Sequence, residues 1–268
     1  MVDEVIVEGI AVDFTDHQAI TTALKDGDII FLNLPSTSFQ PAPPIIAAAL
    51  AIAEAAVKVP SIKLLVFNTS MPVPETTQNV KAQDDRREML RLIRSTGLPT
   101  ISIQPVVFLD NLLEGWARPA LFERNTLVYC HQETLRVSWI CHHDIAQLMI
   151  AAMSRPELAG RNFSVGGPET VELPQLTKIL SKAWKRDLMY ESQTVDDFCD
   201  KISQSMGQRS GLDSKTVISQ MRKAYTYYRE SGEFDVDMTD VLKELPVKLT
   251  TIEEWASMHP FPKDVPES

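Results

Sequence analysis

The chain has 268 residues, of which 44% are hydrophobic and 23% are charged, and its formal net charge is −10. This composition excludes wholesale disorder, and an acidic surface argues against nucleic acid or an anionic membrane as the main partner. Three cysteines are too few for a disulfide framework, so we expect reduced thiols and a cytoplasmic protein. The longest apolar run, 43–57, contains Glu54 and is too short and too weakly hydrophobic to span a bilayer.

Strand-like and helix-like segments alternate through the first part of the chain. Thr15 is expected to cap the first helix, because Gln18 three residues later completes a capping box. The alternation of apolar runs with helices predicts an α/β fold built on a doubly wound parallel sheet. The predicted strands cover 9–14, 28–32, 62–67 and 100–104, and the predicted helices cover 15–25, 44–57 and 83–96.

The remainder of the chain is less regular. Asp144 is expected to cap a helix that runs to Met153, and a long helix is expected to contain Tyr225, Tyr227 and Tyr228. The other predicted strands cover 135–140, 161–165 and 187–191, and the other helices cover 111–124, 144–153, 173–184 and 214–230, with further helix starts at 194 and 251.

Five segments carry a recognisable pattern in a fixed order. They are Val12 to Asp16, a strand with a following aspartate; Asp26 to Leu32, the approach to a buried strand; Thr96 to Leu113; Ile140 to Ala146, with Asp-Ile-Ala; and Gly160 to Thr170. Together they resemble the NmrA-like branch of the atypical short-chain dehydrogenase/reductase family. The third segment resembles the family's "SGLPYTILRPGFFMENLL", and the last resembles "GKxYxLTGPEALT".

The resemblance implies a Rossmann-like, doubly wound parallel sheet and NAD(P) as cofactor. We expect the NAD(P)-binding region to cover 1–154 and a small C-terminal α/β cap, integrated with it, to cover 155–268. Members of the family begin with a strand, a Gly-x-x-Gly-x-x-Gly turn and a helix, which receive the dinucleotide pyrophosphate. The first three glycines here are Gly9, Gly27 and Gly97. The sheet is therefore predicted to be truncated at its N-terminal side, and NAD(P) is expected to bind poorly.

Three explanations of that difference stay open. The sequence could begin at an internal methionine or be shortened, a natural deletion could have produced a cofactor-free protein, or a partner chain could complete the sheet. Losing the central strand of a parallel sheet would expose the pairing edge and the apolar faces of the sheet that remains.

The usual acid–base pair of the wider family is a Tyr followed four residues later by a Lys. Counting back from Gly97 places Ala82 at the Tyr position and Arg86 at the Lys position. The pair is therefore expected to be absent. Arg86 and Arg87 lie within a run of charges, 84–88, which we interpret as a solvated helix face.

Ligands of doubly wound sheets bind beyond the carboxyl ends of the strands. Thr69 and Ser70 follow the strand 62–67 and are the catalytic candidates, since either hydroxyl could hold a substrate oxygen; alternatively they form a strand-ending turn with local hydrogen bonds. By resemblance, other residues line the cofactor or substrate, and the alternative for them is a set of hydrophobic turns. The cofactor-binding candidates are Asp13, Asn33, Pro35, Pro105 and Phe108, and the substrate candidate is Asn111.

Two further clusters admit two interpretations each. The run Cys141-His142-His143-Asp144 has ligand types suited to zinc, but adjacent histidines after a strand point in opposite directions, so no metal site is predicted. The aromatic residues around Tyr225 and Phe234 form either an apolar substrate pocket or the core of the cap, and we favour the core.

The resemblance favours an NAD(P)(H)-dependent reductase of a small apolar carbonyl or enone. The missing Tyr and Lys favour a non-catalytic, NmrA-type regulator that senses a dinucleotide and acts through a protein partner. A third possibility is a cofactor-free isomerase or cyclase that uses the remaining pocket. All three predict a small-molecule partner and no nucleic acid or membrane partner.

Overall fold

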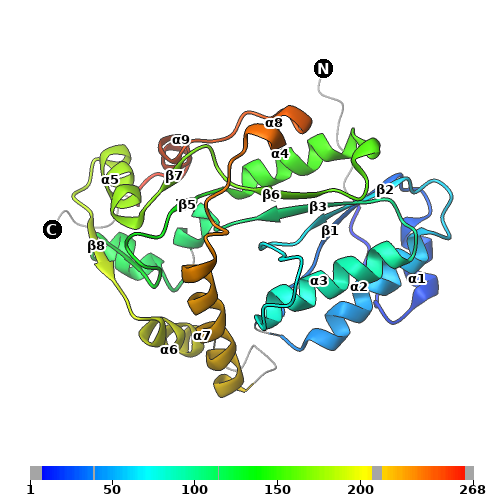
Figure 1. Cartoon of the computed structure of the whole chain (residues 1–268), viewed down its shortest axis with the longest axis horizontal. Helices are drawn as coiled ribbons and strands as arrows, with labels where there is room; N and C mark the ends of the chain where they lie inside the picture. Colours follow the sequence, from blue (N-terminus) through cyan, green and yellow to red (C-terminus); the bar gives the residue numbers. More distant parts are fainter. Residues whose placement is uncertain (1–7, 39, 114, 207–212, 263–268) are drawn as a thin grey trace.

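A parallel four-stranded sheet is the centre of the molecule (Figure 1). The computed structural model describes residues 8–38, 40–113, 115–206 and 213–262. The strand order is β1-β2-β3-β6, and every neighbouring pair is parallel. This confirms the predicted α/β class. The strands are β1 (Ile29–Asn33), β2 (Leu64–Asn68), β3 (Thr100–Pro105) and β6 (Asn162–Val165).

Helices cover the two faces of the sheet unequally (Figure 1). Side chains alternate along a strand, so Leu65 and Phe67 of β2 pack in one core while Leu64 and Val66 pack in the other. The first core is covered by helices on the blue and cyan side of the figure, and the second by a single helix and the cap. The helices of the first face are α1 (His17–Leu24), α2 (Ala42–Ala56) and α3 (Lys81–Ser95), and that of the second is α4 (His142–Met153).

Strand β1 lies at the edge of the sheet. Among the described residues, β2 is its one strand neighbour. Ile30 and Leu32 are buried against the helices of the first face, whereas Phe31 points to the other face and is 46% exposed. The edge of the sheet therefore presents an apolar face that is only partly covered.

The prediction of a strand at 9–14 is wrong. Residues 8–13 are irregular and are followed by a turn. A strand needs a neighbour for its backbone N–H and C=O groups, and no described strand pairs with this segment. The expected cap of α1 is also displaced by one residue: Asp16, not Thr15, accepts hydrogen bonds from the backbone of Gln18 and Ala19 at 3.0 and 2.9 Å.

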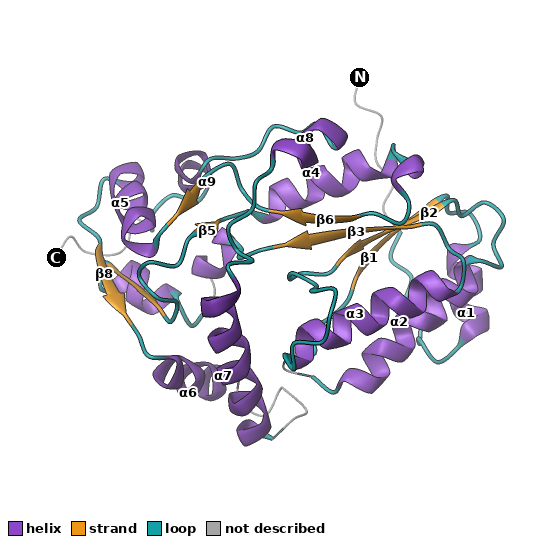
Figure 2. Ribbon diagram, in the orientation of Figure 1, coloured by secondary structure: helices purple, strands orange, loops and turns teal. Residues whose placement is uncertain are grey.

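The cap is a smaller α/β assembly beside the sheet (Figure 2). Its strands pair as a parallel couple, β4 with β8, and an antiparallel couple, β5 with β7. Because β6 belongs to the main sheet and β4 to the cap, the chain passes between the two parts more than once. The predicted boundary between residues 154 and 155 stays a prediction. The elements are β4 (Thr126–Tyr129), β5 (Val137–Ser138), β7 (Thr170–Val171), α5 (Leu173–Trp184), β8 (Met189–Ser192), α6 (Val195–Met206), α7 (Ser214–Ser231), α8 (Thr239–Glu244) and α9 (Ile252–Met258).

Two short helical turns replace the helix predicted at 111–124. They are a 3-10 turn at Leu109–Leu113 and a π-helical turn at Pro119–Glu123. Pro119 lacks an N–H group and therefore begins a helix rather than continuing one. No helix of the described residues has both the length and the apolarity needed to cross a membrane.

The aromatic residues of the C-terminal part pack in the core of the cap. Phe234 is 3% exposed, and Tyr225 and Tyr228 pack against the same core. This confirms the favoured interpretation for these three residues. Tyr225 and Tyr228 also border small cavities on either side of α7, so they separate the core from solvent-accessible space.

Asp144 fixes the segment between α8 and α9. Helix α4 begins at His142 after Cys141, so the prediction that Asp144 is its capping residue is wrong. The carboxylate of Asp144 is fully buried and accepts hydrogen bonds from the backbone N–H and the hydroxyl of Thr250 at 2.9 and 2.7 Å. A side chain in the first turn of α4 thus holds a segment more than a hundred residues away.

A buried hydrogen-bond network joins the sheet region to the cap. Gln83 on α3 donates to Glu233, just after α7, at 2.7 Å, and the Tyr227 hydroxyl donates to the same carboxylate at 3.2 Å. Burial raises the pKa of Glu233 above its ordinary value, and the two hydrogen bonds oppose that shift without cancelling it.

This network predicts a pH dependence of stability. Because the folded Glu233 holds its proton to a higher pH than the unfolded chain, the folded state binds more protons between pH 4.5 and the raised pKa, and stability falls as pH rises through that window. We expect Glu233→Gln to reduce this fall. Urea unfolding at several pH values between 4.5 and 7 measures it, with Glu230→Gln on exposed α7 surface as the control. If the free energy of unfolding falls with pH equally in the wild type and in Glu233→Gln, the prediction is contradicted.

Candidate functional site

A cavity of about 480 Å³ opens at the carboxyl ends of β1, β2 and β3. Asn33 ends β1, Asn68 ends β2, Ser70 follows it, and Phe108 follows β3. Parallel strands bring these positions to one edge of the sheet, which is the usual ligand position in such folds. The opposite wall comes from α4. The lining residues are Phe31, Asn33, Asn68, Ser70, Phe108, His142, Ile145, Ala146, Met149 and Ile150.

Ser70 is held at the polar end of this cavity. Its backbone N–H donates to Asn68 Oδ1 at 2.9 Å, and its hydroxyl donates to Asn33 Oδ1 at 3.2 Å. Its φ of 61° lies in the left-handed region, which costs a non-glycine residue about 1–2 kcal/mol. The two asparagines therefore stabilise a strained turn that places a hydroxyl between the ends of β1 and β2.

His142 and Asp110 form a second polar pair at the same cavity. The His142 backbone N–H donates to Asp110 Oδ2 at 2.9 Å, and its Nδ1 lies 3.7 Å from Asp110 Oδ1. The imidazole also lies against Phe108, with 4.7 Å between ring centroids. A carboxylate beside Nδ1 orients the ring, which leaves Nε2 for a ligand. This pair could not be predicted from the sequence, because its members are 32 residues apart and meet only through the loop after β3.

The rest of the cavity is apolar. Phe31 from β1 and Ile150 from α4 are 46% and 51% exposed, and Met149, next to Ile150 on the helix, also lines the cavity. Large exposed apolar side chains gathered at one hollow typically mark a binding surface. The cavity therefore joins an apolar floor, suited to a flat ring, to a polar end that holds hydroxyl, amide and imidazole groups.

Three of the predicted site residues meet at this cavity: Asn33, Ser70 and Phe108. Thr69 is fully buried, and its hydroxyl donates to the backbone carbonyl of Met71 at 2.6 Å. That hydrogen bond matches the alternative interpretation of a strand-ending turn, so Ser70 rather than Thr69 presents a hydroxyl to the cavity.

The other predicted site residues lie outside the cavity lining. Asp13 is exposed in a turn, where hydrogen bonds from Thr15 lower the pKa of its carboxyl group. Pro105 is the last residue of β3, and Asn111 is hydrogen-bonded to the Tyr129 hydroxyl in the cap. Pro35 offers its carbonyl to Arg86 at 2.9 Å. Their roles toward a ligand stay predictions.

Arg86 is completely buried, so its interpretation as part of a solvated face is wrong. Its position follows the buried side of α3, on which Ala82, Met89 and Ile93 also lie. One guanidinium nitrogen donates to the carbonyls of Leu34 and Pro35 at 2.7 and 2.9 Å. Burial lowers the pKa of Arg86 to about 10. Arg86 thus anchors the loop after β1, next to Asn33, from the other face of the sheet.

We expect Arg86→Met to destabilise the fold by about 2–4 kcal/mol, because two buried carbonyl groups lose their donor. Arg86→Lys should recover part of this loss, since one ammonium group can still reach a carbonyl. Urea unfolding gives both values. Arg91→Met, on the exposed side of the same helix, is the control and should change stability by about 0.5 kcal/mol or less. Equal effects at residues 86 and 91 would contradict the anchoring role.

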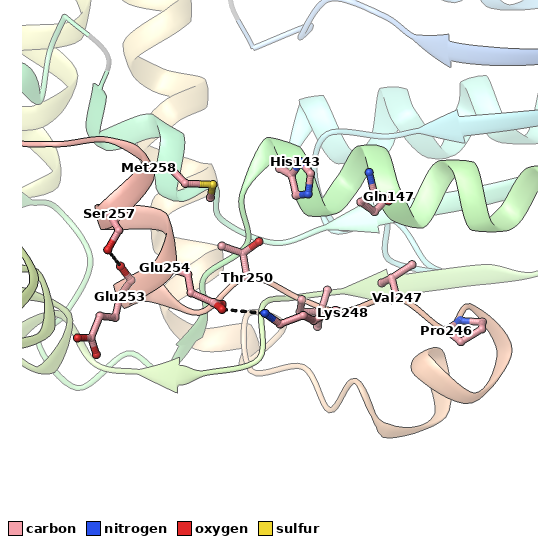
Figure 3. A pocket seen from close by; sticks show the side chains of 11 residues that line it. His143, Gln147, Pro246, Val247, Lys248, Thr250, Glu253, Glu254, Ser257 and Met258 are labelled. Atoms are coloured by element: carbon pink, nitrogen blue, oxygen red, sulfur yellow. Dashed lines mark hydrogen bonds and ion pairs between the residues drawn. The ribbon is translucent and has the colours of Figure 1, made fainter. Parts of the chain in front are cut away.

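A larger groove of about 730 Å³ lies on the outer side of α4 (Figure 3). His143 and Gln147 of α4 face a segment that carries Thr250 and Met258. Lys248 pairs with Glu254 at 2.8 Å across its lower rim. Most of its lining is exposed side chain, and no strand of the main sheet contributes to it. We therefore regard the cavity at the strand ends as the candidate site.

The chain belongs to the NmrA-like family, whose model matches residues 3–256. A curated relative from Streptomyces griseus, a (4-alkanoyl-5-oxo-2,5-dihydrofuran-3-yl)methyl phosphate reductase, is 27% identical over 190 residues. The match covers 71% of this chain and 64% of the relative, which is less than two thirds of the relative's length. The resemblance found in the sequence is thereby confirmed at the level of the family.

Solved structures show the same fold at low sequence identity. A nucleoside-diphosphate-sugar epimerase from Staphylococcus aureus superposes with a TM-score of 0.71 at 17% identity, covering 92% of this chain and 82% of that one. An NADPH-dependent quinone oxidoreductase from Escherichia coli, solved with NADPH, gives 0.70 at 18% identity with the same coverages. These likenesses establish a Rossmann-like fold.

The residues of the cavity fit one part of a dinucleotide. The apolar wall of Phe108 and Ile145 suits a nicotinamide ring, and Asn33, Asn68 and Ser70 supply hydrogen-bonding groups for its amide and ribose. A pyrophosphate is usually received by a glycine-rich turn at a helix N-terminus. The sequence carries no Gly-x-x-Gly-x-x-Gly motif, and the groups that line this cavity suit the nicotinamide end.

Proposed function

We propose that this chain acts as an NAD(P)(H)-dependent reductase of a small, apolar carbonyl or enone. The observation that carries the proposal is the meeting of Ser70, Asn33 and His142 at the mouth of an apolar cavity at the strand ends. Membership of the NmrA-like family and a relative named as a reductase support it. A cytoplasmic location is part of this proposal, because a chain with three cysteines is typical of a reducing compartment.

In this proposal the nicotinamide supplies the hydride, and the chain positions the substrate and provides the proton. The Ser70 hydroxyl donates a hydrogen bond to Asn33. When substrate binds, it donates to the substrate oxygen instead. His142, oriented by Asp110, delivers the proton to the carbonyl oxygen when the hydride goes to the carbonyl carbon, or to the α-carbon when the hydride goes to the β-carbon of an enone. Phe31 and Met149, which line the cavity, exclude water from the substrate carbon that accepts the hydride.

Substitutions at the polar end test these roles. In this proposal Ser70 and His142 stabilise the transition state, by a hydrogen bond and by proton transfer respectively. We therefore expect Ser70→Ala to lower kcat/KM about tenfold and His142→Gln to lower it about a hundredfold. His143→Gln is the matched control, since this neighbouring histidine faces the groove of Figure 3 instead. The assay follows NADPH oxidation with 2-cyclohexen-1-one and 1,4-benzoquinone as probes. Equal rates for His142→Gln and His143→Gln would remove the proton-donating role.

Dinucleotide binding is tested separately from turnover. The melting temperature of the full chain is measured with and without NADPH and NADH, because a ligand at a hundred times its dissociation constant stabilises a fold by about 2.7 kcal/mol. We expect a rise with at least one dinucleotide, and a smaller rise for Asn33→Leu, which removes a polar group of the cavity. If the chain melts cooperatively at the same temperature with and without each dinucleotide, the result argues against the reductase.

A non-catalytic regulator is the second candidate, and the surroundings of Arg86 favour it. Ala82 and Arg86 stand where the wider family carries its Tyr and Lys, and the guanidinium is committed to the carbonyls of Leu34 and Pro35. A regulator would bind a dinucleotide without turnover and act through a protein partner. Turnover without dinucleotide would instead favour a cofactor-free isomerase or cyclase.

A further inference from the structure

The two parallel strands of the cap end at a second hollow in the molecule. β4 and β8 run side by side, with Tyr129 opposite Ser192, and the Gln193 N–H donates to the Tyr129 carbonyl at 3.0 Å. Helix α6 begins directly after β8, and α7 packs against it (Figure 1). The carboxyl ends of parallel strands next to a helix N-terminus form the same kind of ligand position as in a larger sheet.

A cavity of about 450 Å³ occupies this position. It is lined by the residues that follow β4, by those that lead from β8 into α6, and by one face of α7. It shares no lining residue with the cavity at the ends of β1, β2 and β3. Its lining includes imidazole, amide, hydroxyl and guanidinium groups, in contrast to the apolar floor of the candidate reductase site.

His131 lines this cavity. It is 4% exposed and stacks on Tyr129, with 4.9 Å between ring centroids. Its Nδ1 is buried without a hydrogen-bond partner among the described residues, and so is Nε2 of Gln193, which also lines the cavity. Buried polar atoms are nearly always paired in native proteins. Two such atoms border one hollow, where a polar ligand or a water can satisfy them.

Two arginines border the open side. Arg222 and Arg229 are seven residues apart on α7, which places them on the same face two turns apart. Their side chains are 50% and 41% exposed. Arg222 donates from Nε to Asp196, and a guanidinium group carries further N–H donors for another acceptor. Asp196 lines the cavity too, so it competes with any anion for Arg222.

The first turn of α6 adds donors at the same place. The Thr194 hydroxyl accepts the Asp197 N–H at 3.1 Å and donates to the Asp197 carboxylate at 2.6 Å, so these groups satisfy one another. The first N–H groups of a helix lack partners inside the helix. Val195 and Asp196, which both line the cavity, hold two of these positions.

We propose that this cavity is a second binding site, which receives the phosphate or carboxylate group of a small organic anion. The two arginines bind the oxyanion at the rim by charge-assisted hydrogen bonds. Gln193 and His131 donate to it or to its organic part from within. Burial lowers the pKa of His131 to about 3, so the imidazole is neutral at physiological pH and the positive charge of the site resides in the arginines.

Inorganic phosphate and acetate are the probes, each titrated against the full chain by calorimetry, with sodium chloride at matched ionic strength as the reference. We expect saturable binding of at least one oxyanion, weakened about tenfold by Arg229→Gln and by Arg222→Gln. Arg91→Gln, on the exposed side of α3, removes the same charge far from the cavity and should leave binding unchanged. The preferred probe distinguishes a phosphate ester from a carboxylate.

Two further variants separate the site from general electrostatics. His131→Phe keeps the aromatic packing with Tyr129 but removes the ring nitrogens, and we expect weaker binding from a chain that still melts cooperatively. Asp196→Asn removes the competing carboxylate, and we expect tighter binding. The proposal is overturned if all five variants bind the oxyanion as tightly as the wild type does. It is also overturned if phosphate and acetate produce no more heat of binding than sodium chloride. NADPH binding is read out separately, so failure here leaves the reductase proposal standing.

Discussion

Parallel pairing of strands is the constraint from which the rest of this molecule follows. Each parallel pair requires a crossover, and the helices of these crossovers must lie on the faces of the sheet. All the strands therefore end at one edge. Asn33, Asn68, Ser70 and Phe108 meet there although they are spread over 76 residues of sequence, as their positions in the chain show.

Buried polar groups hold the segments that border this edge. Arg86 ties the loop after β1 to α3 through the carbonyls of Leu34 and Pro35. Asp144 ties α4 to Thr250, and Gln83 ties α3 to Glu233 in the cap. Each group is costly to bury and is stabilised by partners from a distant part of the chain. The geometry of the cavity therefore depends on contacts that lie outside it.

The cap repeats the principle of the sheet on a smaller scale. β4 and β8 form a parallel pair, and their ends meet the first turn of α6 as the ends of β1 and β2 meet α4. The two hollows differ in chemistry: one is largely apolar with a serine and a histidine at its mouth, and the other is bordered by arginines. That contrast suits a hydride acceptor in the first and an anion in the second.

The sequence by itself determined the α/β class, the positions of β2, β3, α2, α3 and α5, and the family, because the periodicity of apolar residues and the order of short motifs are local properties. It placed Asn33, Ser70 and Phe108 at strand ends, and so at one edge of the sheet. It could not determine that 9–14 lacks a strand partner or that Arg86 is buried. Nor could it bring His142 to Asp110, or Arg222 to His131. Those outcomes depend on which neighbours a residue meets, and only the tertiary packing of distant segments decides that.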